Sequence, residues 1–126
     1  YWGPALLAFN ARLTDDADAR DALVAECEKL LGGNVLAHNH YLARHHLITL
    51  GRGLGDPEFI EQQCGRLSGY YCQEAMPLAD FMSRRGRVLA AALRGKPSRE
   101  MIAEAQALRD WSTRIGAVSL AAGLDV

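Results

Sequence analysis

The sequence lacks the features that mark several large classes of protein. No apolar stretch approaches the roughly 20 residues that a membrane-spanning helix needs, and no secretion-signal pattern is present. The formal net charge is −1 at pH 7, which argues against strong non-specific attraction to nucleic acid or to an anionic membrane surface. We therefore expect neither a nucleic-acid partner nor a membrane partner.

Cysteine is scarce. The chain has three, Cys27, Cys64 and Cys72, which is an odd number without any Cys-x-x-Cys spacing. Cys64 and Cys72 stand eight residues apart on a predicted helix, a rise of about 12 Å that exceeds the reach of a disulfide. We predict reduced, mostly buried thiols and a cytoplasmic location.

The common catalytic signatures are also missing. The sequence contains no Gly-x-Ser-x-Gly nucleophile turn, no Gly-x-x-x-x-Gly-Lys-Ser/Thr phosphate loop and no Gly-x-Gly-x-x-Gly fingerprint. The glycine-rich stretch at residues 51–55 follows a predicted helix, which makes it a poor phosphate cradle. We predict that this segment is not an enzyme, with no catalytic residue and no cofactor. A small enzyme that pairs Cys64 or Cys72 with a histidine is a less favoured alternative.

What the sequence does contain is helical periodicity along its whole length. Apolar residues recur at helical spacing and no stretch alternates with a period of two, so we predict a single all-α domain over residues 1–126. Because the chain starts at Tyr1 rather than Met, we expect it to be a fragment of a longer protein. Six helices are predicted, from Gly3 to about Leu13, from the Asp16 cap to Gly32, from about His38 to Gly53, from Pro57 to about Tyr71, from Pro77 to Gly95, and from the Ser98 cap to about Ile115.

The predicted helix starts are regularly spaced. The caps Asp16, Asp56 and Ser98 lie 40 and 42 residues apart, and each opens the second helix of a hairpin. This spacing predicts about three tetratricopeptide-like repeats, stacked antiparallel helical hairpins in a right-handed α-solenoid, because one hairpin cannot bury its apolar face alone. An irregular six-helix bundle is the alternative. Gly86 lies mid-helix, where we expect it to let a neighbouring helix approach closely.

Four histidines, His38, His40, His45 and His46, gather near the start of the third predicted helix. No pair of them has the i, i+3 or i, i+4 spacing that places two metal ligands on one helix face. We therefore favour structural roles and predict no metal residues. Either Asn39 or Asn34 is expected to cap this helix. Gly51 and Gly53, near its end, are assigned the same role as Gly86.

The one basic cluster lies in the second half of the chain. Arg84 and Arg87 share a helix face by spacing and Arg94 lies on a related face, so these three are the candidates for partner binding. A solvated helix face neutralised by nearby acids is the simpler interpretation. The cluster comprises Arg84, Arg85, Arg87, Arg94, Lys96 and Arg99, and the nearby acids are Glu58, Glu61, Glu74 and Asp80.

A spaced signature runs through the fifth predicted helix, after a His38-Asn39 pair and a Gly55-Asp56 turn. It is Glu74-x-x-Pro77-x-Ala79-Asp80-Phe81-x-x-x-Arg85-Gly86-Arg87-x-Leu89-Ala90-Ala91. This pattern resembles the tetratricopeptide-like helical region at the C-terminal end of bacterial class III adenylate/guanylate cyclases that also carry a signalling ATPase module. The chain departs from that family in having Pro57 where Trp is usual, and Leu78 and Met82 where aromatic residues are usual.

The resemblance implies a binding or regulatory segment of a larger signalling protein. It implies that the segment has neither cyclase nor ATPase activity by itself. It also implies that its signature residues are structural rather than catalytic; these are His38, Asn39, Asp56, Pro77, Asp80 and Gly86.

Two functional hypotheses follow. The first is a helical-repeat protein-interaction module, with an exposed groove along the first helices of its hairpins. Its partner would be a protein or peptide, or other domains of the parent chain, and a homodimer is also open. The second is a free-standing helical ligand- or metal-sensing domain that uses the segment from His38 to His46.

Overall fold

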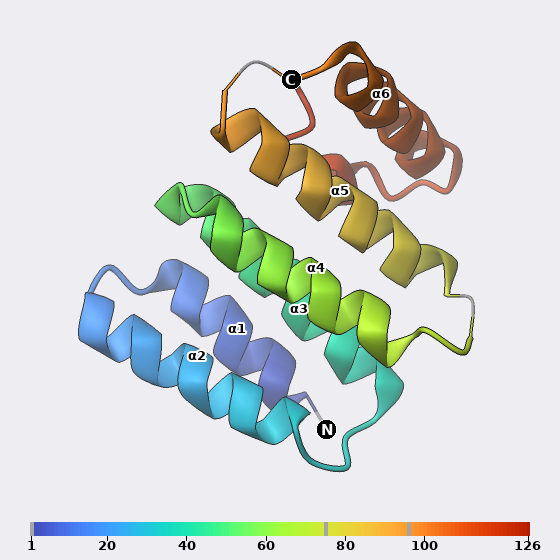
Figure 1. Cartoon of the computed structure of the whole chain (residues 1–126). Helices are drawn as coiled ribbons and strands as arrows, with labels where there is room; N and C mark the ends of the chain where they lie inside the picture. Colours follow the sequence, from blue (N-terminus) through green and yellow to red (C-terminus); the bar gives the residue numbers. More distant parts are fainter. Residues whose placement is uncertain (1, 75, 96) are drawn as a thin grey trace.

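The computed structural model describes residues 2–74, 76–95 and 97–126. Over these ranges the protein has six α-helices, one short 3₁₀-helix and no strand, which confirms the prediction that it is all-α. The elements are α1 (Gly3–Leu13), α2 (Ala17–Leu31), α3 (Ala37–Leu54), α4 (Pro57–Tyr70), α5 (Pro77–Leu93), α6 (Arg99–Arg114) and η1 (Val118–Ala121) (Figure 1). None of the described helices is both long and apolar enough to cross a bilayer.

Helix starts follow local capping chemistry. Asp16, Asp56 and Ser98 are N-caps, as predicted, and each side chain accepts the backbone N–H three residues further on, at 2.8, 2.9 and 3.3 Å. α3 begins within one residue of the predicted start, but its cap was predicted wrongly. Its N-cap is Leu36, which makes no side-chain cap, so neither Asn34 nor Asn39 fills this role. Asn39 instead lies fully buried in the first turn.

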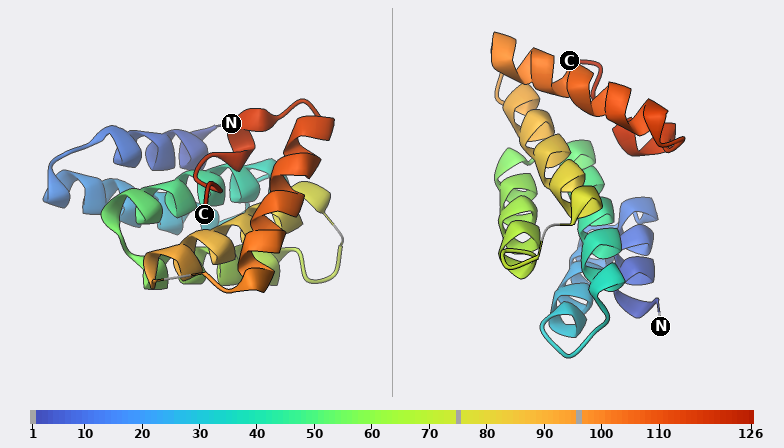
Figure 2. Two further views of the ribbon diagram at one scale, coloured as in Figure 1. Left: turned by 90° about the horizontal axis from the view of Figure 1, so that it is seen from above. Right: turned by 90° about the vertical axis from the view of Figure 1, so that its right-hand side faces the viewer.

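The first five helices form two layers. α1, α3 and α5 lie in one layer, and α2 and α4 lie in the other (Figures 1 and 2). Within and between these layers, α1 packs along both α2 and α3, and α4 packs along α3 and α5. The last helix departs from this pattern, because α6 crosses α5 instead of running beside it (Figure 2).

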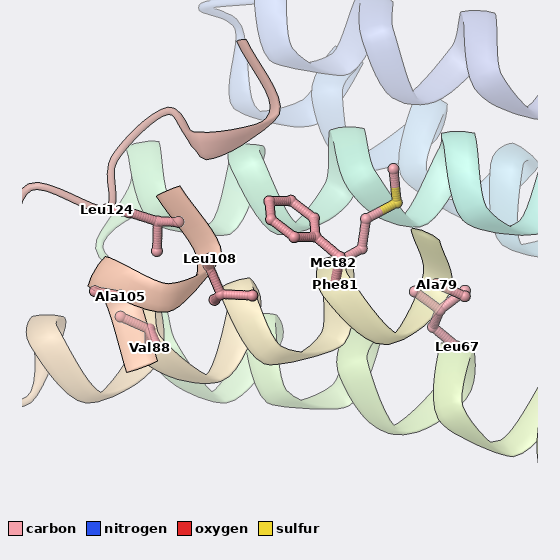
Figure 3. Packing of buried hydrophobic residues seen from close by; sticks show 8 residues of the cluster. All are labelled: Leu67, Ala79, Phe81, Met82, Val88, Ala105, Leu108 and Leu124. Carbon is pink, nitrogen blue, oxygen red and sulfur yellow. The ribbon is translucent and has the colours of Figure 1, made fainter. Parts of the chain in front are cut away.

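The hydrophobic interior consists of three clusters along the chain. The first joins α1, α2 and α3 around Leu47, and the second joins α3, α4 and α5 around Ile60. The third joins α4, α5, α6 and the C-terminal segment (Figure 3). Its eight buried members are Leu67, Ala79, Phe81, Met82, Val88, Ala105, Leu108 and Leu124.

Two glycines permit close helix contacts. A Cβ at Gly86 would lie 2.3 Å from the Cys64 sulfur, so this buried position brings α5 close to α4. A Cβ at Gly51 would lie 2.7 Å from Cγ1 of Ile60, so α3 also approaches α4. These roles were predicted for both residues. The same prediction for Gly53 is wrong, because a Cβ there meets nothing within 4 Å.

The C-terminal segment turns back over α5. Arg85 is 1% exposed, and its Nε and Nη2 donate to the backbone carbonyl of Ala122 at 3.1 and 2.7 Å. Leu124 is fully buried in the third cluster. Sequence periodicity did not predict this segment, because a 3₁₀-turn followed by extended chain carries no repeating apolar pattern.

Candidate functional site

The four histidines do not converge on one point. Their rings pack against different neighbours, with His38 on Trp2, His40 stacked on Tyr70, and His46 against Phe9 and Arg12. Among the residues that the structure describes, no group of three or more His, Cys, Asp or Glu side chains could hold a metal ion. The four histidines are close in the sequence but do not form one cluster in the structure, because their side chains leave α3 in different directions.

His45 is half-buried on α3. Its Nδ1 is buried and has no hydrogen-bond partner among the described residues. Burial, reinforced by the positive charges of Arg85, His46 and Arg12, lowers the pKa of His45 from 6.5 to about 3. The imidazole is therefore neutral in the folded protein down to strongly acidic pH.

We expect His45 to make the fold acid-sensitive. The unfolded chain binds a proton near pH 6.5 and the folded chain does not. The free energy of unfolding should therefore fall as the pH drops from about 6.5 toward 3, by up to about 1.4 kcal/mol per pH unit. His45→Leu should reduce this slope when urea unfolding is compared between pH 7 and pH 4. Burial also lowers the pKa values of His40 and His46, so part of the slope should remain. Equal slopes in the two proteins would contradict the assignment.

Two of the three thiols are enclosed by the fold. All three cysteines are free; Cys27 and Cys64 are buried, and Cys72 is exposed. Burial, the largest influence, raises the pKa of each buried thiol to about 11, so neither is a thiolate near neutral pH. Cys72 lies beyond Tyr70, the last residue of α4, so the prediction that it shares a helix with Cys64 is wrong.

The three candidate arginines contact different neighbours. Arg84 forms a two-point ion pair with Glu104 of α6, with N···O distances of 2.5 and 3.0 Å, whereas Arg87 approaches Ser68 of α4 at 3.4 Å. The two side chains therefore reach toward different helices, although they stand three residues apart on α5. The Arg84–Glu104 pair was not predicted, because Glu104 is distant in the sequence and on another helix.

The neighbouring acids neutralise part of the basic cluster. Arg94 pairs with Glu61 at 2.5 Å and Glu58 at 3.0 Å, and Arg84 also lies 3.4 Å from Asp80. These three acids were predicted for this role. Two candidate arginines therefore already carry carboxylate partners. Lys96 lies outside the described residues.

The other signature residues hold helix geometry. Pro77 lies at the start of α5, where its missing N–H costs no helical hydrogen bond, and Asp80 is the acidic residue of that first turn. His38 is half-buried, and its ring centre lies 5.5 Å from that of Trp2. These positions agree with structural roles for the signature.

An apolar depression opens on the layer of first helices. It has a volume of about 360 Å³ and lies between α1 and α3; we call it the α1–α3 groove. Its aromatic and aliphatic walls are exposed, since Trp2 is 59%, Leu6 57% and Phe9 40% accessible. The sequence predicted a groove along the first helices but did not identify its residues. The lining residues are Trp2, Ala5, Leu6, Phe9, Leu42 and His46.

A second depression lies beyond the far end of this groove. It has a volume of about 640 Å³ and is bordered by the C-terminal ends of α1, α3 and α5 and by the first turn of α2; we call it the arginine cleft. Arg12, Arg20 and Arg52 line it together with the exposed carboxylate of Asp15. Sequence analysis missed this cluster, because its arginines come from three helices and are spread over 40 positions.

Comparison of the chain with protein-family models, with curated proteins and with solved structures finds no match.

Proposed function

We propose that this chain is a non-catalytic helical-repeat interaction module that docks a peptide segment of a partner protein in the α1–α3 groove. In this proposal it serves as a regulatory part of a longer signalling protein, resembling the C-terminal repeat region of bacterial cyclases that carry an ATPase module. The partner segment presents apolar side chains together with an acidic residue. It belongs to another protein or to another domain of the parent chain.

The repeat part of the proposal rests on helix order and spacing. The hairpins α1–α2, α3–α4 and α5–α6 have caps 40 and 42 residues apart, and their first helices occupy one layer. This supports three tetratricopeptide-like units in a right-handed α-solenoid. The crossing of α6 over α5 marks the third unit as a divergent one, as is common for terminal repeats.

The observation that carries the docking proposal is the exposure of large apolar side chains in a concave site. Trp2, Leu6 and Phe9 line one wall of the groove, and Leu42 of α3 faces them. Aromatic and aliphatic anchors in a depression are typical of sites where a few residues supply most of the binding energy. The groove also follows the direction of two helices, which suits a peptide better than a compact ligand.

The positive charge of Arg12 is the reason for expecting an acidic residue in the partner segment. Arg12 lies at the end of the groove, where its Nη1 is 2.8 Å from Nδ1 of His46. No carboxylate lies within ion-pair distance of Arg12 in the described part of the chain. An Asp or Glu beside the apolar residues of the partner would pair with Arg12. Arg84 and Arg94 are less suited to this role, because each already pairs with a carboxylate.

Selection from a library of random dodecapeptides tests the proposal. We expect peptides with apolar residues flanked by an acid, and binding that weakens at least about tenfold in Phe9→Glu and in Leu6→Glu. Leu13→Glu is the matched control, because Leu13 is 67% exposed on the same helix but does not line the groove.

Two outcomes would contradict the proposal. One is the selection of peptides whose binding is indifferent to Phe9→Glu and Leu6→Glu. The other is a concentration-dependent dimer, seen by sedimentation velocity and abolished by Phe9→Glu, which would assign the groove to a second copy of the chain. The metal-sensing alternative is not proposed further, since no group of three or more His, Cys, Asp or Glu side chains in the described ranges could hold a metal ion.

A further inference from the structure

The arginine cleft concentrates positive charge that the protein does not balance. Arg12, Arg20 and Arg52 line it, and none of them has a carboxylate within ion-pair distance in the described ranges. The same holds for Arg85, which is 1% exposed. A buried guanidinium usually has a counter-charge, because removing it from water is costly. Asp15 is the one carboxylate in the lining, so the cleft stays positive overall.

These charges lie within electrostatic reach of each other. Nη1 of Arg85 is 3.5 Å from the hydroxyl of Thr49, and Thr49 lines the cleft. Burial, together with the charges of Arg52 and Arg12, lowers the pKa of Arg85 to about 10. Like charges gathered at one point oppose folding unless an anion neutralises them, and such arrangements are enriched at functional sites.

The helix dipole explains the positions of two of the three cleft arginines but not the third. Arg12 and Arg52 occupy the last turns of α1 and α3, where a positive charge favours the helix carbonyl end. Arg20 lies instead in the first half of α2, where the helix dipole does not favour a positive charge. Its Nε is buried and has no hydrogen-bond partner among the described residues, so neither the dipole nor an internal partner accounts for Arg20 beside the cleft.

The size and walls of the cleft indicate the kind of ligand. Its volume of about 640 Å³ falls in the range of small-molecule sites. It is larger than a bare oxyanion requires. Leu54 and Leu93 line it with 48% and 39% of their surfaces exposed, so apolar wall lies next to the guanidinium groups. Guanidinium forks match the oxygens of a phosphate more closely than a single ammonium does.

We infer that the arginine cleft binds a phosphomonoester carried on an apolar group, with Arg12, Arg20 and Arg52 around the phosphate and Leu54 and Leu93 against the apolar body. The cleft adjoins the α1–α3 groove and shares Arg12 with the proposed peptide site, but its test rests on Arg20 and Arg52, which do not line the groove. Gly53 of the glycine-rich stretch at residues 51–55 also lines the cleft, but glycine supplies no charge. Side chains of three helices supply it instead.

Calorimetric titration with phenyl phosphate at constant ionic strength tests this inference. We expect saturable binding at least about tenfold tighter than that of inorganic phosphate, which lacks the apolar body, and of benzoate, which lacks the second charge. Arg20→Gln and Arg52→Gln should each weaken phenyl phosphate binding about tenfold or more, since each loses a charge-assisted hydrogen bond. Arg99→Gln is the control for net charge, because Arg99 is exposed and lines none of the described cavities.

Three results would overturn the inference. They are the absence of saturable binding, equal affinity for phenyl phosphate and benzoate, and an Arg99→Gln variant that loses as much affinity as Arg52→Gln. Equal affinity for phenyl phosphate and inorganic phosphate would contradict the claim that the cleft also binds an apolar group. Thermal unfolding of each variant confirms that it is folded at the titration temperature. Arg52→Lys, which keeps the charge but not the fork, should show a smaller loss than Arg52→Gln.

Discussion

Replacing Arg44 with alanine is expected to lower the free energy of unfolding by about 3 kcal/mol. The Arg44 side chain is buried in α3, and its Nη1 donates to Oε1 of Glu28 at 2.5 Å and to Oε1 of Gln63 at 2.6 Å. These acceptors belong to α2 and α4, so one guanidinium joins three helices. The variant would leave the fully buried Gln63 amide without its donor, which costs more than a lost surface contact. Urea unfolding at neutral pH, followed by circular dichroism, measures the change.

Arg66→Ala is the matched control for Arg44→Ala. Arg66 also bonds the Glu28 carboxylate, but its side chain is 49% exposed. We expect its removal to cost less than about 1 kcal/mol, as for other exposed ion pairs. Arg44→Met, which keeps most of the volume, should lie between the two. Equal losses in Arg44→Ala and Arg66→Ala would mean that neutralisation of Glu28, rather than the buried junction, sets the stability.

Gly86→Leu is expected to destabilise the fold by about 3 kcal/mol, at the upper end of the usual cost of overpacking a core. Even a Cβ at this position would lie 2.3 Å from the Cys64 sulfur and 3.3 Å from Cδ1 of Ile48. A leucine side chain would therefore force α5 away from both α3 and α4. The melting temperature and the urea midpoint both report this change.

A control variant and a double variant test whether the clash with Cys64 causes the loss of stability at Gly86. Gly65 lies on α4 with nothing within 4 Å of its Cβ position, so Gly65→Leu should instead stabilise the helix by up to about 1 kcal/mol. Gly86→Ala combined with Cys64→Ala should cost at least about 1 kcal/mol less than the sum of the single changes, because the clashing sulfur is gone. Additive losses would show that the clash with Cys64 is not the cause.

The features predicted correctly from the sequence are those governed by local chemistry. Asp16, Asp56 and Ser98 were found because an N-cap acts on a backbone N–H three residues away. Pro77 was found because proline is favoured in the first turn of a helix. Such signals require no knowledge of which helices meet, and the helix boundaries therefore agree closely with the structure.

The features that were missed depend on contacts between distant segments. Leu54 continues the helical spacing of the buried Leu47 and Leu50, yet it is 48% exposed, because it lies in the last turn of α3 beside the arginine cleft. Arg44 and Arg85 are buried, which composition alone disfavours for a charged residue. Their partners, Gln63 and the carbonyl of Ala122, lie 19 and 37 residues away in the sequence. The candidate sites are of this second kind, since both the groove and the cleft combine residues of α1 and α3.

The hydrophobic interior is divided along the chain rather than shared by all helices. α3, α4 and α5 each contribute buried residues to two of the three clusters, whereas α1 and α2 contribute them only to the first and α6 only to the third. An outer helix can therefore detach while the clusters on the far side stay intact. Amide protons of the central helices should be the last to exchange with solvent, and resistance to local opening should fall gradually toward both ends. The peptide groove proposed on α1 would then belong to one of the more easily opened parts of the molecule.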